Sequence, residues 1–379
     1  MNENYHIPSL PQPLDKFCKN HPLQELSTDT RILLQHFISY HSLEQKSVWW
    51  INQTQTDIDD TFKSHLTESY MLKKMYNLLL WNEWMHINST AKQVDIRLYL
   101  YKGLALSYQL YGDATARPTR DLDIFVLEDQ LFETDAMLKK LGYERVKPDF
   151  ELSKKQQRQL KHHIHHFSYV HPEKNVLLEL HWQLVVPISL FPMGTYIFND
   201  TLTKISEPFQ QYPWEWLLHY LIIHGAMHHW YKLIWLSDID AILRKNIINM
   251  ESFQGMASIY HDKRMVNVAF FLTHHIFETP LPLEITLTRK ERTIVQFCMN
   301  SILNEQNYLK SQGIKRMRRV CYLSSLKKSI QHKVKCWFAI STNADDWQLI
   351  PLPDRWFFLY YLLRPFLMVH AYFSKRKTS

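Results

Sequence analysis

Two aspartates, Asp121 and Asp123, stand one residue apart in a short apolar stretch that reads RDLDIFV. In an extended strand the side chains alternate between faces, so the two carboxylates point the same way. Leu122 and Ile124 then point to the opposite face, towards a core. Neighbouring carboxylates repel each other unless a cation lies between them, and Mg²⁺ prefers carboxylate oxygens together with substrate phosphates. The pattern predicts a metal site, and the alternative is a solvated strand edge with two acids.

A third acid, Glu179, lies between Leu178 and Leu180 in a second apolar stretch. A carboxylate among leucines in the middle of a strand costs free energy unless it is paired or metal-bound. If this strand lies beside the one that carries Asp121 and Asp123, three carboxylates converge. A two-metal site for in-line displacement at phosphorus needs such a set. We therefore predict that all three acids are catalytic residues and metal ligands, with Glu179 also a candidate base for the acceptor. The alternative is that Glu179 lies on a solvated face.

A turn at Lys102–Gly103 lies upstream of the acids, between a predicted strand and a predicted helix. A glycine there lets the backbone approach a phosphate, and the N-terminus of the helix adds a favourable dipole. Lys102 adds a point charge for a triphosphate. Arg117 and Arg120 lie in the loop before the acids, where guanidinium groups can hold phosphate oxygens or pair with carboxylates. We predict that these four residues bind the nucleotide; for Arg120 an ion pair is an equal alternative.

The elements that must position these residues divide the chain into three predicted regions. Residues 1–90 have helical spacing, residues 91–190 alternate between strand and helix, and residues 191–379 are mainly helical again. The fold class is therefore predicted as mixed α/β (α+β), with a small mixed sheet and flanking helical domains. The clearest C-terminal helical segment is Trp214–Arg244. The predicted strands are Asp95–Tyr101, Leu122–Leu127, Phe167–Val170 and Val176–Leu180.

Three motifs resemble the nucleotidyltransferase superfamily: K-G-x-A from Lys102, R-P-x-x-D-x-D-I-x-V from Arg117 and E-L-H-W from Glu179. More narrowly, they resemble the uncharacterised nucleotidyltransferases often met in bacterial clusters that make modified peptides and other natural products. The resemblance covers mainly residues 95–185, with a weaker echo at 224–243. It implies the same metal ligands and the same phosphate turn. His181 and Trp182 complete the third motif without an assured chemical role.

The resemblance implies transfer of a nucleoside monophosphate from an NTP to an acceptor, with release of pyrophosphate. The implied cofactor is Mg²⁺, as two ions, with Mn²⁺ as a substitute, and the NTP is the co-substrate. The acceptor stays open: a small molecule, a peptide, a protein or a tRNA. One departure is Leu104, because the superfamily usually has serine after the glycine. A degenerate protein that binds a nucleotide or a partner without catalysis is therefore one alternative.

The 379-residue chain carries a formal charge of +7, and a basic surface is consistent with anionic partners. The basic run Lys315–Arg319 makes a nucleic-acid-binding protein with incidental acids a second alternative, beside a solvated helix face. Four scattered cysteines form no C-x-x-C pair, which fits neither a zinc site nor a disulfide framework. No secretory signal is visible, and the apolar stretch Trp356–Phe373 is interrupted by Arg364 and Pro365. We expect a cytoplasmic protein without a transmembrane segment.

Histidines cluster twice. His162, His163, His165 and His166 precede a predicted strand, at a spacing too tight for a zinc pair on one helix face. A solvated basic loop is the favoured interpretation, and the alternative is that His165 or His166 faces the acids and contacts phosphate.

The second histidine cluster contains His224 and His228, which are four residues apart as in H-E-x-x-H zinc sites, but the glutamate is absent. A core helix with satisfied histidines is favoured. The alternative is a wall of the substrate cleft, with Lys232 and Asp238 facing the α/β region.

Overall fold

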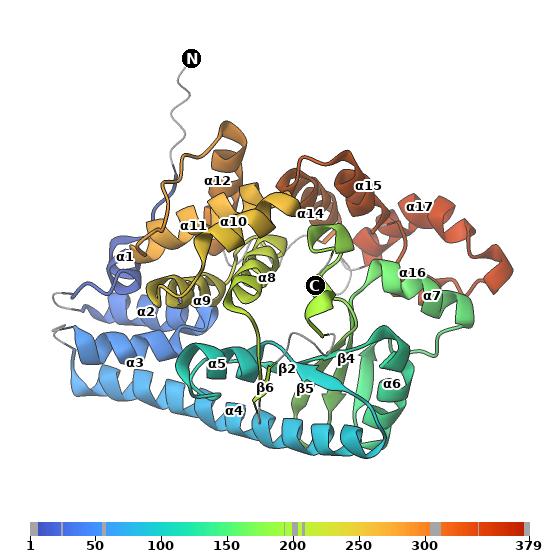
Figure 1. The fold of residues 1–379 in the computed structure, drawn as a ribbon, viewed down its shortest axis with the longest axis horizontal. Coiled ribbons are helices and arrows are strands. Elements are labelled where there is room, and N and C mark those ends of the chain that lie inside the picture. Colours follow the sequence, from blue (N-terminus) through green and yellow to red (C-terminus); the bar gives the residue numbers. More distant parts are fainter. Residues whose placement is uncertain are drawn as a thin grey trace. The chain divides into compact units, whose positions relative to one another are not determined.

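The computed structural model describes residues 7–23, 26–54, 58–192, 194–198, 204–206, 209–303, 312–339 and 341–374. It confirms the mixed α/β prediction, with a five-stranded mixed sheet and many helices (Figure 1). The chain divides into two compact units, each assembled from three segments. Unit 1 consists of Met1–His86, Leu100–Leu122 and Asn199–Glu305, and unit 2 of Ile87–Tyr99, Asp123–Phe198 and Gln306–Ser379. The three consecutive regions expected from the sequence stay a prediction.

Two of the first four helices, α2 and α4, begin at polar residues that accept hydrogen bonds from the open helix ends. The Ser27 side chain accepts from the backbone N–H of Thr30, and the Asp59 carboxylate accepts from that of Phe62. Inside unit 1, the ring of Trp50 packs edge-on against Phe17 at 5.4 Å between ring centroids. The bounds are Gln12–Cys18 (α1), Thr28–His41 (α2), Glu44–Gln53 (α3) and Asp60–Gln93 (α4).

The later part of unit 1 is a group of packed helices, and Figure 1 shows α8 and α9 side by side. The predicted single segment Trp214–Arg244 is wrong in one respect, because a loop separates α8 from α9. His229 and Trp230 in that loop adopt positive φ, which ends the helical path. The bounds are Trp214–Met227 (α8), Leu233–Arg244 (α9), Met250–Ile259 (α10), Lys263–Phe277 (α11) and Arg289–Leu303 (α12), with a small sheet of Lys204–Ser206 (β6) and Phe209–Gln211 (β7).

The five-stranded sheet has the order β1-β2-β5-β4-β3, so β2 and β5 are neighbours. Its strands are Leu98–Leu100 (β1), Asp121–Val126 (β2), Glu144–Lys147 (β3), His166–His171 (β4) and Val176–His181 (β5). The strand predicted at Asp95–Tyr101 is shorter than expected, since Asp95 has a positive φ and the strand starts only at Leu98. The edge strand β3 was not predicted, because its sequence ERVK has no apolar alternation.

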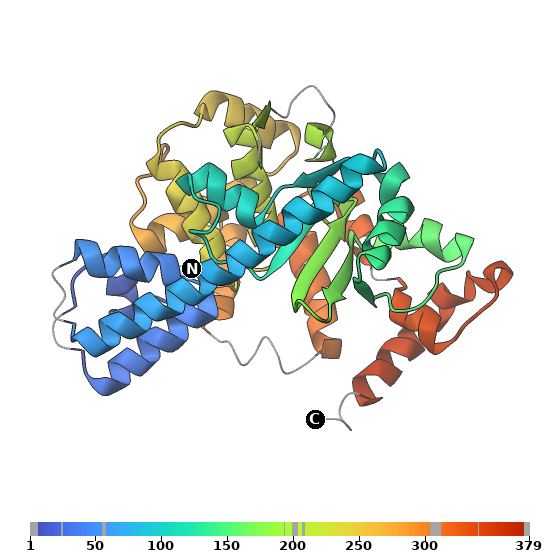
Figure 2. The ribbon, with the colours of Figure 1, turned by 90° about the horizontal axis from the view of Figure 1, so that it is seen from below.

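Strands β4 and β5 form an antiparallel pair, seen as two adjacent green arrows in Figure 2. Their register places His166 opposite His181 and Ser168 opposite Glu179. Since side chains alternate along a strand, these four polar residues share one face. The opposite face carries fully buried apolar side chains from the same strands, namely Phe167, Tyr169, Leu178 and Leu180. One face of the sheet is thus a core and the other a polar surface.

Further helices complete both units. Helix α5, Gly103–Tyr111, belongs to unit 1, and the helices of unit 2 are Leu131–Lys140 (α6), Lys154–His163 (α7), Gln312–Leu326 (α14), Ile330–Phe338 (α15), Ala344–Leu349 (α16) and Leu359–Ser374 (α17). Short 3-10 helices are Glu128–Gln130, Ile188–Leu190, Gly194–Phe198 and Asp354–Trp356. The buried Arg364 of α17 pairs with Asp346 of α16.

Among the described residues, no helix combines the length and apolarity that a membrane span requires.

Gly225 gives a test of the packing between α8 and the loop that follows. A Cβ at Gly225 would lie 2.1 Å from the ring of Trp230, whereas a Cβ at Gly255 in α10 would meet nothing within 4 Å. We expect Gly225→Ala to lower the free energy of unfolding by about 1–3 kcal/mol, because the indole must shift. Gly255→Ala should leave it unchanged or raise it by up to ~1 kcal/mol through helix propensity. Denaturant titration checks both, and equal effects would contradict the packing.

Candidate active site

Two acids from neighbouring strands meet at one buried histidine. Nε2 of His181 lies 3.1 Å from Oδ1 of Asp123 on β2 and 3.2 Å from Oε2 of Glu179 on its own strand, β5. His181 is 1% exposed and Asp123 is 6% exposed, so the contact is shielded from water. The neighbouring strands that the three-acid hypothesis requires are therefore present. The imidazole between the two carboxylates was not predicted, although E-L-H-W already placed a histidine two residues after the glutamate.

Glu179 is strongly held in its charged form. Burial alone raises its pKa, and the charge of Asp123 acts in the same direction. The hydrogen bond with His181 and the nearby imidazoles of His181 and His166 outweigh these effects and lower the pKa to about 2. A carboxylate with this pKa keeps its negative charge at neutral pH. It suits a ligand for a cation better than a proton acceptor.

Asp121 occupies the first position of β2, two residues before Asp123, and is half-buried. Alternation along the strand gives both side chains the same face, as the D-x-D pattern predicts. The division of the chain falls between Leu122 and Asp123, so Asp121 belongs to unit 1. Its place as a third ligand stays a prediction.

The predicted phosphate turn has the expected backbone form. Helix α5 starts at Gly103, whose φ is +49°, and Lys102 is its N-cap residue. A Cβ at Gly103 would lie 2.9 Å from Oγ1 of Thr119 and 3.6 Å from the carbonyl oxygen of Asp121, so the turn packs against the start of β2. Leu104, at the position where a serine was expected, is buried in the core. The groups that the turn offers to a phosphate are therefore the backbone N–H groups and the side chain of Lys102, and their role stays a prediction.

The loop before the acids is held by buried polar groups of unit 1. The side-chain amide of Asn77 on α4 donates to the carbonyl oxygens of Thr115 and Arg117, at 3.0 and 2.8 Å. Its oxygen accepts from the backbone N–H of Thr119 at 3.3 Å. The hydroxyl of Ser107 on α5 accepts from the backbone N–H of Arg117 at 2.9 Å. The loop conformation is thus fixed on two sides.

Arg117 itself makes a buried two-pronged ion pair with Asp238 on α9. Its Nε and one terminal nitrogen donate to the two carboxylate oxygens at 2.7 and 2.9 Å. Asp238 thus contacts a residue of the predicted α/β region, while the substrate-cleft wall of that alternative stays a prediction. Lys232 instead donates to the carbonyl oxygen of Tyr40 on α2. The guanidinium of Arg117 is engaged by a protein carboxylate, and its predicted role in phosphate binding stays a prediction.

Arg120 differs from Arg117 in exposure. Its side chain is exposed, and its backbone carbonyl accepts a hydrogen bond from the hydroxyl of Tyr76 on α4 at 3.1 Å. The positive charge of Arg120 acts on the buried carboxyl of Glu44, where it counters the rise in pKa that burial causes. Its predicted contact with a nucleotide also stays a prediction.

A cavity of about 440 Å³ within unit 2 borders the polar face of the sheet. His165, His166 and Ser168 form part of its wall. This part of the wall lies beside the acid cluster, Asp123 and Glu179, since Ser168 is opposite Glu179 in the register. The remaining wall comes from the end of β3 and the loop after it, the end of α7, the segment 186–187, and α14, α15, α16 and α17 with the loop before α16. Charged side chains of both signs line it, including Lys147, Arg319, Asp149 and Asp345.

The first histidine cluster does not form a solvated loop. His163 is buried, and Nε2 of His166 lies 3.5 Å from Oε1 of Glu179. His166 therefore faces Glu179, and the phosphate contact in that alternative stays a prediction. The reason is the register, because His166 opens β4 directly opposite His181. The side chain of His162 lies outside the described residues.

His224 and His228 lie in and just after the end of α8, with ring centroids 4.9 Å apart and both packed against Trp235. Among the described residues, the groups close enough to share a metal ion do not include them. The favoured interpretation as packed helix histidines agrees with this arrangement.

The donors around the acids fit a divalent cation. Asp123, Glu179 and His181 each offer one ligand atom, and these atoms lie within 4.8 Å of one another. In the structure the imidazole lies between the two carboxylates, where it partly offsets their repulsion. Carboxylate oxygens suit Mg²⁺ or Mn²⁺, and the neighbouring nitrogen widens the range of ions that can bind.

The Arg117–Asp238 pair gives a test of how the loop before the acids is held. Asp238→Asn should lower the free energy of unfolding by about 3–5 kcal/mol, because it leaves a buried guanidinium without its counter-charge. Glu151→Gln removes an exposed partner of Lys139 and should cost less than ~1 kcal/mol. Denaturant titration of both variants provides the measurement. An Asp238→Asn effect as small as that of the control would show that the pair does not hold the loop.

Comparison with known proteins agrees with the motifs. The model of a family described as uncharacterised nucleotidyltransferases matches residues 40–278, which include both acid strands, the glycine turn and Asp238. No curated protein and no solved structure matches the chain. The matched segment covers more than half of the sequence, and the chain therefore belongs to this nucleotidyltransferase family.

Proposed function

We propose that this protein transfers a nucleoside monophosphate from an NTP to an acceptor in a metal-dependent reaction that releases pyrophosphate. The observation that carries the proposal is the meeting of Asp123 and Glu179 at His181, on the polar face of the sheet. Family membership supports nucleotidyl transfer as the general class. The metal, the acceptor and pyrophosphate release belong to the proposal.

Asp121, Asp123 and Glu179 would hold the metal, as two Mg²⁺ or Mn²⁺ ions. When bound, the metal supplies positive charge against the phosphate oxygens and against the oxygens that attack and leave. The low pKa of Glu179 supports its role as a ligand over a role as the general base. His181 would orient both carboxylates through the two contacts that it makes with them.

The triphosphate would bind at the Lys102–Gly103 turn. The N-terminus of α5 presents backbone N–H groups and the positive end of the helix dipole, which favour an anion, although the N–H of Ala105 already donates to the carbonyl oxygen of Lys102 at 3.1 Å. The ammonium group of Lys102 adds charge. Arg120 is exposed and is a second candidate for a phosphate oxygen. The buried Leu104 offers no hydroxyl, so the proposal rests on the backbone and on these cations.

The acceptor would occupy the cavity of unit 2. Its wall at His165, His166 and Ser168 adjoins Glu179, so an acceptor bound there would lie beside one of the proposed metal ligands. An acceptor oxygen or nitrogen would attack the α-phosphorus and release its proton to solvent water. The bond from the α-phosphorus to the oxygen that bridges to the β-phosphate would break, and pyrophosphate would leave with that electron pair.

A form that binds nucleotide without catalysis is the second candidate, favoured by the single observation that Leu104 replaces the expected serine. The two candidates differ in whether label from an α-labelled NTP reaches an acceptor. The nucleic-acid-binding alternative draws on Arg318 and Arg319 of the basic run, which are exposed on α14, whereas the side chains of residues 315–317 lie outside the described residues. Lys327, just after α14, is buried. Binding of that kind would weaken steeply with salt and survive removal of Mg²⁺.

Asp123→Asn tests the enzyme proposal. With an α-labelled NTP, Mg²⁺ or Mn²⁺ and host cell extract, the wild-type protein should label an acceptor. The Asn variant should label it at least about a hundredfold more slowly, the usual cost of losing one group that stabilises transition-state charge. Asp129→Asn, in the 3-10 helix after β2, is the matched control and should behave as wild type. Equal labelling by both variants, or none by the wild type with every NTP and several extracts, would contradict the proposal.

Gly103→Ala tests the phosphate turn separately from the chemistry. The added methyl group would press on Thr119, and alanine would have to adopt a positive φ that it disfavours. The turn should therefore shift, and NTP binding should weaken by more than about tenfold. Gly112→Ala is the matched control, because Gly112 also has a positive φ, of 72°, but has open space around it. Calorimetric titration with Mg²⁺·ATP compares the two variants. Equal affinities would show that the turn does not contact the nucleotide.

A further inference from the structure

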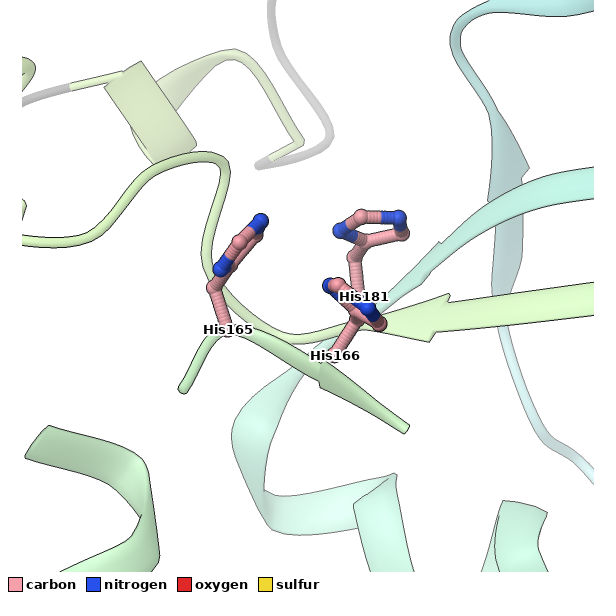
Figure 3. A group of neighbouring side chains, drawn as sticks. All are labelled: His165, His166 and His181. Atoms are coloured by element: carbon pink, nitrogen blue, oxygen red, sulfur yellow. The ribbon is translucent and has the colours of Figure 1, made fainter. Parts of the chain in front are cut away.

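Three imidazoles gather at the edge of the acid cluster. His165, His166 and His181 each present a ring nitrogen, and these nitrogens lie within 4.8 Å of one another. The ring centroids are 4.6, 5.4 and 4.8 Å apart for the three pairs. Figure 3 shows the three side chains around a common space, two from the start of β4 and one from the end of β5.

The backbone of the β4–β5 hairpin fixes this arrangement. His166 and His181 are direct partners in the register, which brings their rings together on one face. His165 precedes the strand, and its carbonyl oxygen accepts from the backbone N–H of Trp182 at 3.1 Å. This bond fixes the backbone at His165, where the chain bends before β4, and the His165 ring lies 4.6 Å from that of His166. The hairpin register therefore places His166 and His181, and the bend that precedes it places His165.

The chemistry of the donors differs from that of a magnesium site. Mg²⁺ takes oxygen ligands in a near-ideal octahedron and rarely uses imidazole. Zn²⁺, Co²⁺ and Mn²⁺ accept imidazole nitrogen, and three protein ligands with an open fourth position are typical of catalytic zinc. Glu179 lies 3.5 Å from Nε2 of His166 and 3.2 Å from Nε2 of His181, so a carboxylate oxygen is at hand to complete the shell.

We propose that His165, His166 and His181 form a binding site for one transition-metal ion, of the Zn²⁺ type, with Glu179 as an additional oxygen donor. The inference rests on the proposed function only in placing this ion next to the reacting phosphate. The binding itself needs no nucleotidyl transfer. His181 belongs to this group and also to the group with Asp123 and Glu179.

Partial exposure of the cluster supports a ligand site over simple packing. His166 keeps a quarter of its side chain exposed, and Glu179 about as much, at 25% and 30%. His165 and His166 also line the 440 Å³ cavity, which gives an ion and a fourth ligand a path from solvent. A cluster built only for packing would gain more from full burial of its rings.

The test uses the full chain, stripped of metal by chelator and titrated with Co²⁺ and Zn²⁺. The wild-type protein should bind one Co²⁺ per chain with the intense visible absorption of a low-coordinate nitrogen site, and Zn²⁺ should displace it. The double variant H165A/H166A should lose this absorption and bind Zn²⁺ at least a hundredfold more weakly. Both residues are partly exposed, so the variant should fold, which circular dichroism checks.

Two controls distinguish this metal site from metal binding by other histidines and from the proposed nucleotidyl transfer. H224A/H228A removes another adjacent pair of histidines and should leave the Co²⁺ spectrum unchanged. D121N should abolish transfer of α-label if the proposed function is right, while it leaves the Co²⁺ spectrum in place. The spectrum can therefore survive a failure of the proposed function. Absence of bound Co²⁺ in the wild type, or a folded H165A/H166A variant that binds Zn²⁺ as tightly as wild type, overturns the site.

Discussion

The imidazole of His181 lies between the carboxylates of Asp123 and Glu179, and much of the sheet can be understood from that contact. Two acids cannot be brought together in a water-poor place unless a cation or a donor offsets their repulsion. The contact requires β2 and β5 to be neighbours. It also requires Asp123 and His181 to lie towards the polar face while Leu122, Leu178 and Leu180 fill the core. The alternation of side chains meets both conditions at once.

A second set of buried polar contacts stabilises the approach to these acids in unit 1. Asn77 and Ser107 hold the backbone of the loop that leads into β2, and Arg117 ties the same loop to Asp238 on α9. Each of these groups would be costly to bury without its partner. The loop is consequently fixed by interactions with three helices. This explains why an arginine before the acids is valuable to the structure even without a phosphate contact.

Much of this arrangement could be predicted from the sequence, and the limits have physical causes. D-x-D in an apolar stretch identified β2, and a lone glutamate among leucines identified β5. A carboxylate in an apolar strand costs free energy unless it is paired or metal-bound, so such a residue indicates a site. The edge strand β3 has no such alternation and was missed. A single helix was expected over Trp214–Arg244, but the chain breaks where Trp230 packs back against Gly225. Helical spacing in the sequence gives no information about that tertiary contact.

The histidines show a further limit of the sequence. H-H-I-H-H looked like a solvated segment, because spacing along the chain gives no information about a partner strand. Only the register of β4 with β5 places His166 opposite His181 and next to Glu179. In the same way, Arg117 looked like a phosphate ligand because its partner, Asp238, lies more than a hundred residues away. Residues that act through long-range pairing are those that local patterns describe least well.

The central claim is that one metal centre forms where Asp123, Glu179 and His181 meet. A crystal structure of the protein with Mn²⁺ and an NTP analogue that resists cleavage at the α-phosphorus tests it most directly. The account predicts anomalous density for Mn²⁺ within bonding distance of Asp123 and Glu179, with the α-phosphate on the same ion. Nucleotide and manganese bound elsewhere, with His181 still bridging the two carboxylates, would contradict it.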